Sequence, residues 1–334
     1  MIFHPPVLAL LGSSWLAVVV LLAGAVFAVR LLRHWDRESG SERQIGLERA
    51  TILVSTTVAL VLALEAASLI LFVFNADRMA SLFVGAMCAV GTLNASVWGF
   101  PTLFAKIAVF FAASLWLVLD RIDGEGRDWP FVRMKYAALL AVVPILLLEA
   151  GFETSYFLDL KADTITSCCG RLFEDGAQSS GAGGELAGID PSTALALLFG
   201  ATSLAAVLGL FGARFRVVQI LMGPASGLVF ALGLTGVVSV VSLYVYEQPH
   251  HHCPFCLLKP EYDHFGFLLY LPLFVGTAAG LSAGMLGLLP RRASLAEALP
   301  STAARASRVA AIGFALFALA CLWAIGRSNL VLLG

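Results

Sequence analysis

The sequence predicts an all-α polytopic integral membrane protein, a single bundle over residues 1–334 with about eight transmembrane helices and one interfacial or re-entrant segment. Hydrophobic residues make up 59% of the 334 residues and charged residues only 13%. Soluble domains usually carry about a quarter charged residues. The net charge is −1, and no Lys/Arg-rich patch or nucleic-acid motif is present. We therefore expect contact with a lipid bilayer and no nucleic-acid partner.

Eight apolar runs have the length of a membrane span, which is about 20 residues. They cover approximately residues 7–32, 50–74, 102–119, 134–158, 192–211, 217–246, 266–289 and 309–325. Residues 79–100 are also apolar, but only Pro101 separates them from the next run. Two full spans cannot reverse direction across one residue, so this piece is predicted to be interfacial or re-entrant and packed on protein.

Two glycine patterns predict details of helix packing. Gly223-Pro224, near the start of the sixth run, predicts a kink. Gly276, Gly280 and Gly284 recur every four residues in the seventh run. In lipid, such a stripe lets a neighbouring helix approach closely.

Basic residues predict the orientation. Most of the 21 Lys and Arg residues fall in alternate loops, around residues 30–49, 120–135, 214–216 and 291–308. The positive-inside rule places these loops in the cytoplasm. Both termini and the loops 159–191 and 247–265 then face the periplasm of a bacterial inner membrane.

The two outer loops contain most of the cysteines and histidines. Loop 247–265 carries three consecutive histidines, the Cys253-Pro-Phe-Cys256 unit and His264, and loop 159–191 carries the vicinal Cys168 and Cys169. The remaining Cys88 and Cys321 fall in apolar segments, where cysteine is usually an inert small hydrophobe.

A thiol–disulfide or electron-transfer function is the first interpretation of these loops. The Cys-x-x-Cys geometry and the neighbouring protonated His250–His252 would lower the pKa of Cys253 and make it the exchanging thiolate. Cys256 would be its resolving partner, and Cys168 and Cys169 would shuttle electrons to or from the pair.

This arrangement resembles the bacterial disulfide-forming membrane oxidoreductases and the vitamin K epoxide reductases. Those families pair a membrane-surface Cys-x-x-Cys with two loop cysteines and pass electrons to a quinone. The resemblance therefore implies a quinone cofactor. It covers the cysteine arrangement alone, since this chain has more spans and its loop pair is vicinal.

Metal binding is the first alternative, because thiolates with imidazoles form the soft ligand set that suits copper or zinc. Glu261 and Asp263 would orient the histidines. The candidate ligands are His250, His251, His252, His264, Cys168, Cys169, Cys253 and Cys256.

A non-enzymatic subunit is the second alternative. Structural disulfides would then cross-link the outer loops, and these loops would form a docking surface for a periplasmic partner. A redox or metal-carrying protein is the partner expected under the first two interpretations. The residues alone leave open whether the protein is an enzyme.

Glu65, Lys106 and Glu149 are charged residues inside predicted spans, in the outer halves of their helices. Charges at such positions are expensive and usually face a bundle interior or a wet cavity. Lys106 could pair with either acid, as a structural salt bridge or as part of a proton or ion path.

Overall fold

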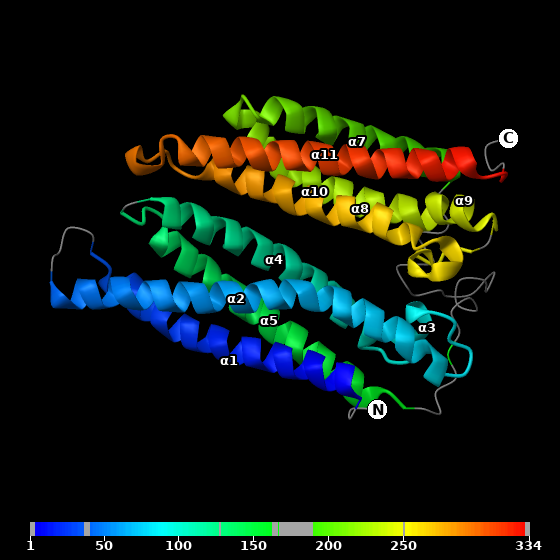
Figure 1. The fold of residues 1–334 in the computed structure, drawn as a ribbon, viewed down its shortest axis with the longest axis horizontal. Helices are drawn as coiled ribbons and strands as arrows, with labels where there is room; N and C mark the ends of the chain where they lie inside the picture. The colour runs from blue at the N-terminus through cyan, green and yellow to red at the C-terminus, as the bar shows by residue number, and fades with distance from the viewer. Residues whose placement is uncertain are drawn as a thin grey trace. The chain divides into compact units, whose positions relative to one another are not determined.

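The computed structural model describes residues 4–36, 41–126, 128–161, 166, 190–249 and 251–330. Within these residues, eight helices are long and apolar enough to cross a membrane (Figure 1). They are α1 (Pro5–His34), α2 (Glu42–Met79), α4 (Gly99–Glu125), α5 (Val132–Asp159), α7 (Pro191–Gly212), α8 with its continuation to α9 (Arg216–Tyr246), α10 (Phe265–Leu288) and α11 (Ala298–Arg327). The predicted all-α membrane bundle of eight spans is confirmed.

The segment between α2 and α4 does not cross the membrane. It holds a single 3-10 turn, η1 (Ala80–Leu82), and the six-residue helix α3 (Ala89–Asn94). Six helical residues extend only about 9 Å, against about 30 Å of hydrocarbon. The predicted interfacial or re-entrant segment is therefore confirmed, and the end of α2 and the start of α4 lie on the same side of the membrane.

Local sequence signals explain where several helices begin. Pro5 and Pro191 occupy the first turns of α1 and α7, where a missing N–H costs nothing. The Asp190 carboxylate accepts a hydrogen bond from the Thr193 N–H at 3.1 Å and caps α7. Ser41 caps α2 in the same way.

The chain divides into two compact units. Unit 1 comprises Met1–Val84, Thr92–Ile165 and Arg291–Leu299, and unit 2 comprises Gly85–Gly91, Thr166–Pro290 and Pro300–Gly334. Whether the chain acts as the single domain that the sequence predicts stays an open prediction.

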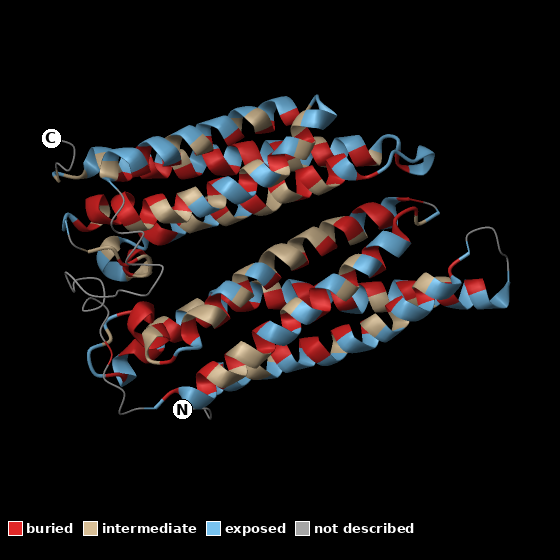
Figure 2. Ribbon diagram, turned by 180° about the vertical axis from the view of Figure 1, so that it is seen from behind, coloured by how far each residue is buried: buried red, intermediate tan, exposed pale blue. Residues whose placement is uncertain are grey.

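Unit 1 is a four-helix bundle in which α1 packs on α2 and α5, and α4 packs on the same two helices. Its core contains large rings such as Trp116 and Tyr136, which are almost wholly buried. Along these helices buried and exposed residues alternate (Figure 2), and many of the exposed ones are large and apolar, such as Leu16, Leu60 and Phe104. Both features are expected where lipid rather than water surrounds the bundle.

Unit 2 packs α7, α8, α10 and α11 through small residues. A Cβ on Gly284 would lie 2.6 Å from the Cα of Gly223 in α8, and a Cβ on Gly313 in α11 would lie 2.8 Å from the Cα of Gly276. The predicted close approach is confirmed, but the stripe serves two neighbours. Gly280 and Gly284 face α8, whereas Gly276 faces α11.

The sixth span contains an irregular turn, and the kink expected at Gly223-Pro224 stays a prediction. Helix α8 (Arg216–Gly236) runs through Pro224 without a break. The irregular turn is η2 (Val237–Val241), a π-helical turn that leads into α9 (Ser242–Tyr246). Turns of this kind are often found at functional sites, and this one directly precedes the His/Cys loop.

Candidate functional site

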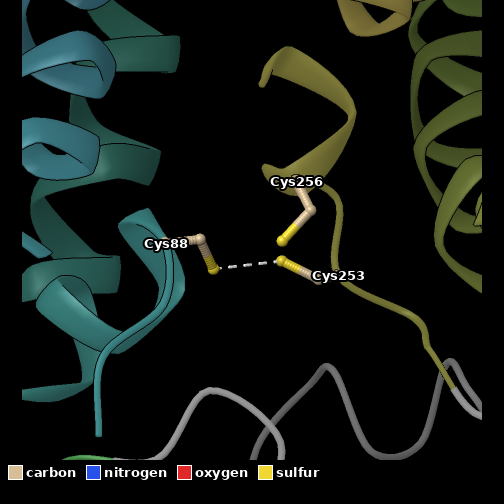
Figure 3. Close-up of side chains that lie close together, drawn as sticks. All are labelled: Cys88, Cys253 and Cys256. Carbon is tan, nitrogen blue, oxygen red and sulfur yellow. Dashed lines mark hydrogen bonds between the residues drawn. The ribbon is translucent and has the colours of Figure 1, made fainter. Parts of the chain in front are cut away.

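Three buried cysteines converge in unit 2. The sulfurs of Cys88, Cys253 and Cys256 all lie within 4.8 Å of one another, and the Sγ atoms of Cys88 and Cys253 are 3.3 Å apart (Figure 3). Their residues are 0%, 2% and 7% exposed, respectively. No disulfide joins any cysteine in the described part of the chain. The three thiols form a small, dry cluster of soft donor atoms.

A tight turn brings Cys253 and Cys256 together. Pro254 and Phe255 reverse the chain, and Cys256 opens the 3-10 turn η3 (Cys256–Leu258). The hydroxyl of Tyr246 donates to the carbonyl oxygen of Cys253 at 2.5 Å. The hydroxyl of Tyr270 donates to the carbonyl oxygen of Pro254 at 2.7 Å. The two tyrosines therefore hold the turn against α9 and α10.

Cys88 reaches the cluster on the segment between η1 and α3. The Thr166 hydroxyl donates to the carbonyl oxygen of Gly91 at 2.8 Å, and the Lys259 ammonium donates to that of Met87. Gly85 has φ +88°, and a Cβ there would lie 2.1 Å from the carbonyl oxygen of Thr166. A glycine is therefore required for the segment to lie this close to Thr166.

The order of the spans is consistent with these cysteines lying on one side of the membrane. Among the described residues between Cys88 and Cys253, the helices long and apolar enough to cross are α4, α5, α7 and the α8–α9 span. An even number of crossings returns the chain to the same side. The sequence analysis set Cys88 aside as an inert residue of an apolar segment. Its position in the non-spanning segment was the signal that this cysteine could meet the Cys-x-x-Cys.

The described histidines of the loop, His251, His252 and His264, do not join the cluster. His251 stacks on Tyr246 with ring centroids 4.2 Å apart, and burial, followed by the charge of His252, lowers the pKa of His251. The Nδ1 of His252 lies 3.0 Å from the carbonyl oxygen of Val238 in the π turn. The Nδ1 of His264 lies 2.7 Å from the carbonyl oxygen of Leu258. These rings fasten the loop to α9, to the π turn and to the loop's own backbone.

Other residues in the predicted set have different positions. Cys168, Cys169 and His250 lie outside the described residues. The Asp263 carboxylate, expected to orient a histidine, lies 3.6 Å from the Arg327 guanidinium.

The surroundings of Cys253 and Cys256 raise the pKa of both thiols, whereas the sequence predicted a lowered pKa for Cys253. A hydrogen bond with Cys256, with added burial, raises the pKa of Cys253 to about 12. At Cys256, the hydrogen bond with Cys253 lowers the pKa, but the bond with Cys88 and burial outweigh it and raise the value to about 12. The prediction of a lowered pKa was wrong, because the pair is buried, begins no α-helix and has no described histidine in its cluster.

The charged residues predicted inside spans meet in unit 1. The ammonium of Lys106 lies 2.6 Å from Glu149 Oε1 and 3.1 Å from Glu153 Oε1. Its Nζ also donates to the hydroxyl of Ser68 at 3.2 Å, and this hydroxyl donates to Glu65 Oε2 at 3.1 Å. The sequence analysis missed Glu153, which lies four residues after Glu149 on the same face of α5.

The cluster of Cys88, Cys253 and Cys256 in unit 2 can therefore bind a soft metal ion or take part in thiol–disulfide exchange. The cluster around Lys106 in unit 1 can hold buried charges.

Comparison of the chain with known protein families, with curated proteins and with solved structures gives no match.

Proposed function

We propose that the protein is a copper-handling protein of the bacterial inner membrane and that Cys88, Cys253 and Cys256 bind one Cu(I) ion. The observation that carries the proposal is the convergence of the three buried sulfurs within 4.8 Å. Metal–thiolate bonds of about 2.3 Å in a trigonal arrangement require sulfurs about 4 Å apart. The short Cys88–Cys253 separation of 3.3 Å and the 4.8 Å limit bracket that value.

The donor set favours Cu(I) over zinc. Thiolates are soft ligands, and Cu(I) accepts three of them without a further group. Structural zinc is almost always four-coordinate. In the described part of the chain, no histidine or carboxylate joins the three sulfurs. Calcium and magnesium take oxygen ligands and do not suit this cluster.

The positive-inside pattern of the loops supports a site on the periplasmic face, with both termini on that face. The sulfurs are almost completely buried, so the metal would be exchanged by direct transfer from a periplasmic metal-carrying protein rather than with free solution. The loop 247–265 would be the surface that meets this partner.

Thiol–disulfide exchange is the second candidate, because Cys253 lies against both other thiols. Two thiols would form one disulfide and lose two protons and two electrons to an oxidised acceptor, such as a quinone or the disulfide of a partner protein. The raised pKa of Cys253 counts against this function, because the thiolate is the attacking species. Metal binding displaces the thiol proton instead.

The test is a Cu(I) titration of the reduced protein in detergent against a coloured competing chelator. We expect one Cu(I) per chain, and X-ray absorption should show sulfur ligands only. Cys88→Ser, Cys253→Ser and Cys256→Ser should each weaken binding by more than the about 10- to 100-fold lost when residues supporting a metal site are changed. Cys321→Ser is the matched control, since Cys321 is a buried thiol outside the cluster.

Unchanged Cu(I) affinity in Cys88→Ser would contradict the proposal, as would an equal loss in Cys321→Ser. A redox titration under metal-free conditions tests the second candidate. A reversible Cys253–Cys256 disulfide with a potential well above about −300 mV would favour exchange, since structural disulfides usually lie below that range.

A further inference from the structure

The charged cluster of unit 1 is almost completely withdrawn from solvent. Glu65 and Lys106 are each 2% exposed, and Glu149 and Glu153 are 0% exposed. The four residues come from three spanning helices, α2, α4 and α5. Such groups within a span are costly and mark functional sites by default.

The charges in this cluster do not balance. Three carboxylates surround one ammonium group, so the cluster carries two excess negative charges when every acid is ionised. An uncompensated charge in low-dielectric surroundings costs several kcal/mol even after relaxation. Carboxylates that share one site lower this cost when a proton neutralises one of them.

Two carboxylate oxygens also lack partners. Glu65 Oε1 and Glu149 Oε2 are buried and have no hydrogen-bond partner among the described residues. The other oxygens of these carboxylates lie against Ser68 and Lys106, respectively. A buried acceptor without a donor is unfavourable, whereas a protonated carboxyl group supplies its own O–H donor.

A second buried ion cluster in unit 1, around Lys135, shows that an excess of carboxylates does not by itself leave carboxylate oxygens without a partner. The ammonium of Lys135 lies 3.0 Å from Asp120 Oδ1 and 3.1 Å from Asp123 Oδ2. Asp123 Oδ1 accepts from the backbone N–H of Phe131 at 2.7 Å, and the side chain of Asp120 is 23% exposed. Here both carboxylate oxygens of the buried Asp123 have a partner, and the excess charge reaches the surface through Asp120.

We propose that Glu65, Glu149 and Glu153, together with Lys106, form a reversible proton-binding centre in the core of unit 1. The reaction is the addition of a proton from water to one of the three carboxylates, which gives a carboxylic acid and leaves the cluster one unit less negative. The three acids share the bound proton around the fixed ammonium. This centre gives the protein a proton-linked activity separate from its thiol chemistry.

The surroundings of the centre contain no other charged side chain that interacts with it in the described residues. Helix α1 contributes Ser14, whose hydroxyl donates to Glu153 Oε2 at 2.5 Å. Helix α2 contributes Glu65, Ser68 and the ring of Phe72, whose centroid is 5.6 Å from Lys106 Nζ. Helix α4 contributes Lys106, and α5 contributes both remaining acids.

The experiment is infrared difference spectroscopy of the full-length protein in lipid nanodiscs as the pH is cycled. A buried carboxylic acid has a C=O stretching band separate from those of carboxylates and amides, and the band shifts in D2O. We expect this band to grow in acid and disappear in alkali, reversibly. Glu149→Gln and Glu153→Gln should remove or shift it, whereas Asp123→Asn, in the paired cluster, should leave it unchanged.

Glu65→Gln is the second variant if either α5 variant fails to fold, because its amide oxygen can still accept from Ser68. The proposal is overturned if the wild-type protein shows no pH-dependent acid band, or if the three Glu→Gln variants retain the wild-type band. A band that stays constant at every pH would show a permanently held proton and would also overturn it. The same holds if replacing Na+ by choline changes the band, since the ligand would then be a metal cation.

Discussion

Units 1 and 2 each contain four spanning helices, but they bury different chemical groups. Among the described residues, unit 1 buries two lysines and four carboxylates and unit 2 buries no charged side chain. Unit 2 instead buries all four described cysteines and packs its helices through glycine. The comparison indicates that buried charged side chains and buried thiols are kept in separate bundles of the described chain.

The largest expected effect on stability comes from removing Lys106, the one cation in the cluster with Glu65, Glu149 and Glu153. Lys106→Met should destabilise the protein by about 3–5 kcal/mol, because breaking a buried ion pair leaves its partner charges uncompensated. Thermal unfolding in nanodiscs measures this loss. The double variant Lys106→Met with Glu149→Gln should recover part of it, and a double variant no more stable than the single one would contradict the role of charge.

Metal addition should stabilise the molecule through unit 2. At Cu(I) concentrations about 100-fold above the dissociation constant, binding adds about 2.7 kcal/mol to the free energy of unfolding. The melting temperature should therefore rise in the wild-type protein and in Cys321→Ser. An equal rise in Cys88→Ser would mean that Cu(I) binds outside the three-cysteine cluster.

A smaller effect on the free energy of unfolding is expected when a closely packed glycine of unit 2 is substituted. Gly284→Ala should cost about 1–3 kcal/mol, the usual penalty for overpacking, since the new Cβ meets backbone that cannot move aside. Gly227→Ala in α8 is the matched control, because no atom lies within 4 Å of its Cβ position. It should stabilise the helix by up to about 1 kcal/mol. Equal effects of the two substitutions would remove the evidence for close helix contact.

The smallest expected effect concerns the turn that carries the thiols. Tyr270→Phe removes the donor to the Pro254 carbonyl oxygen and should cost about 1 kcal/mol, the net value of one hydrogen bond. Cu(I) affinity should fall along with it, because the turn positions Cys253 and Cys256. Tyr244→Phe is the control, as the Tyr244 hydroxyl makes no hydrogen bond to this turn. Unchanged Cu(I) affinity in Tyr270→Phe would show that the sulfurs hold their positions without this support.

The sequence by itself determined the membrane fold. Apolar runs of span length and a single residue between residues 79–100 and the next run are sufficient to predict eight spans and one segment that does not cross, because hydrocarbon allows few other arrangements. The Cys-x-x-Cys and three of the four buried charges of the unit 1 cluster were also visible, since polar groups are conspicuous in such a chain.

The tertiary structure decided which of these groups meet. Cys88 and Cys253 are 165 positions apart, and no local pattern specifies that pairing. Glu153 was not among the charged residues singled out from the sequence, and only the bundle places it beside Lys106. The pKa of Cys253 likewise depends on burial and on neighbouring thiols, which packing creates. Local sequence determines which segments enter the membrane, whereas the environment of each buried group depends on contacts between segments that are distant in the chain.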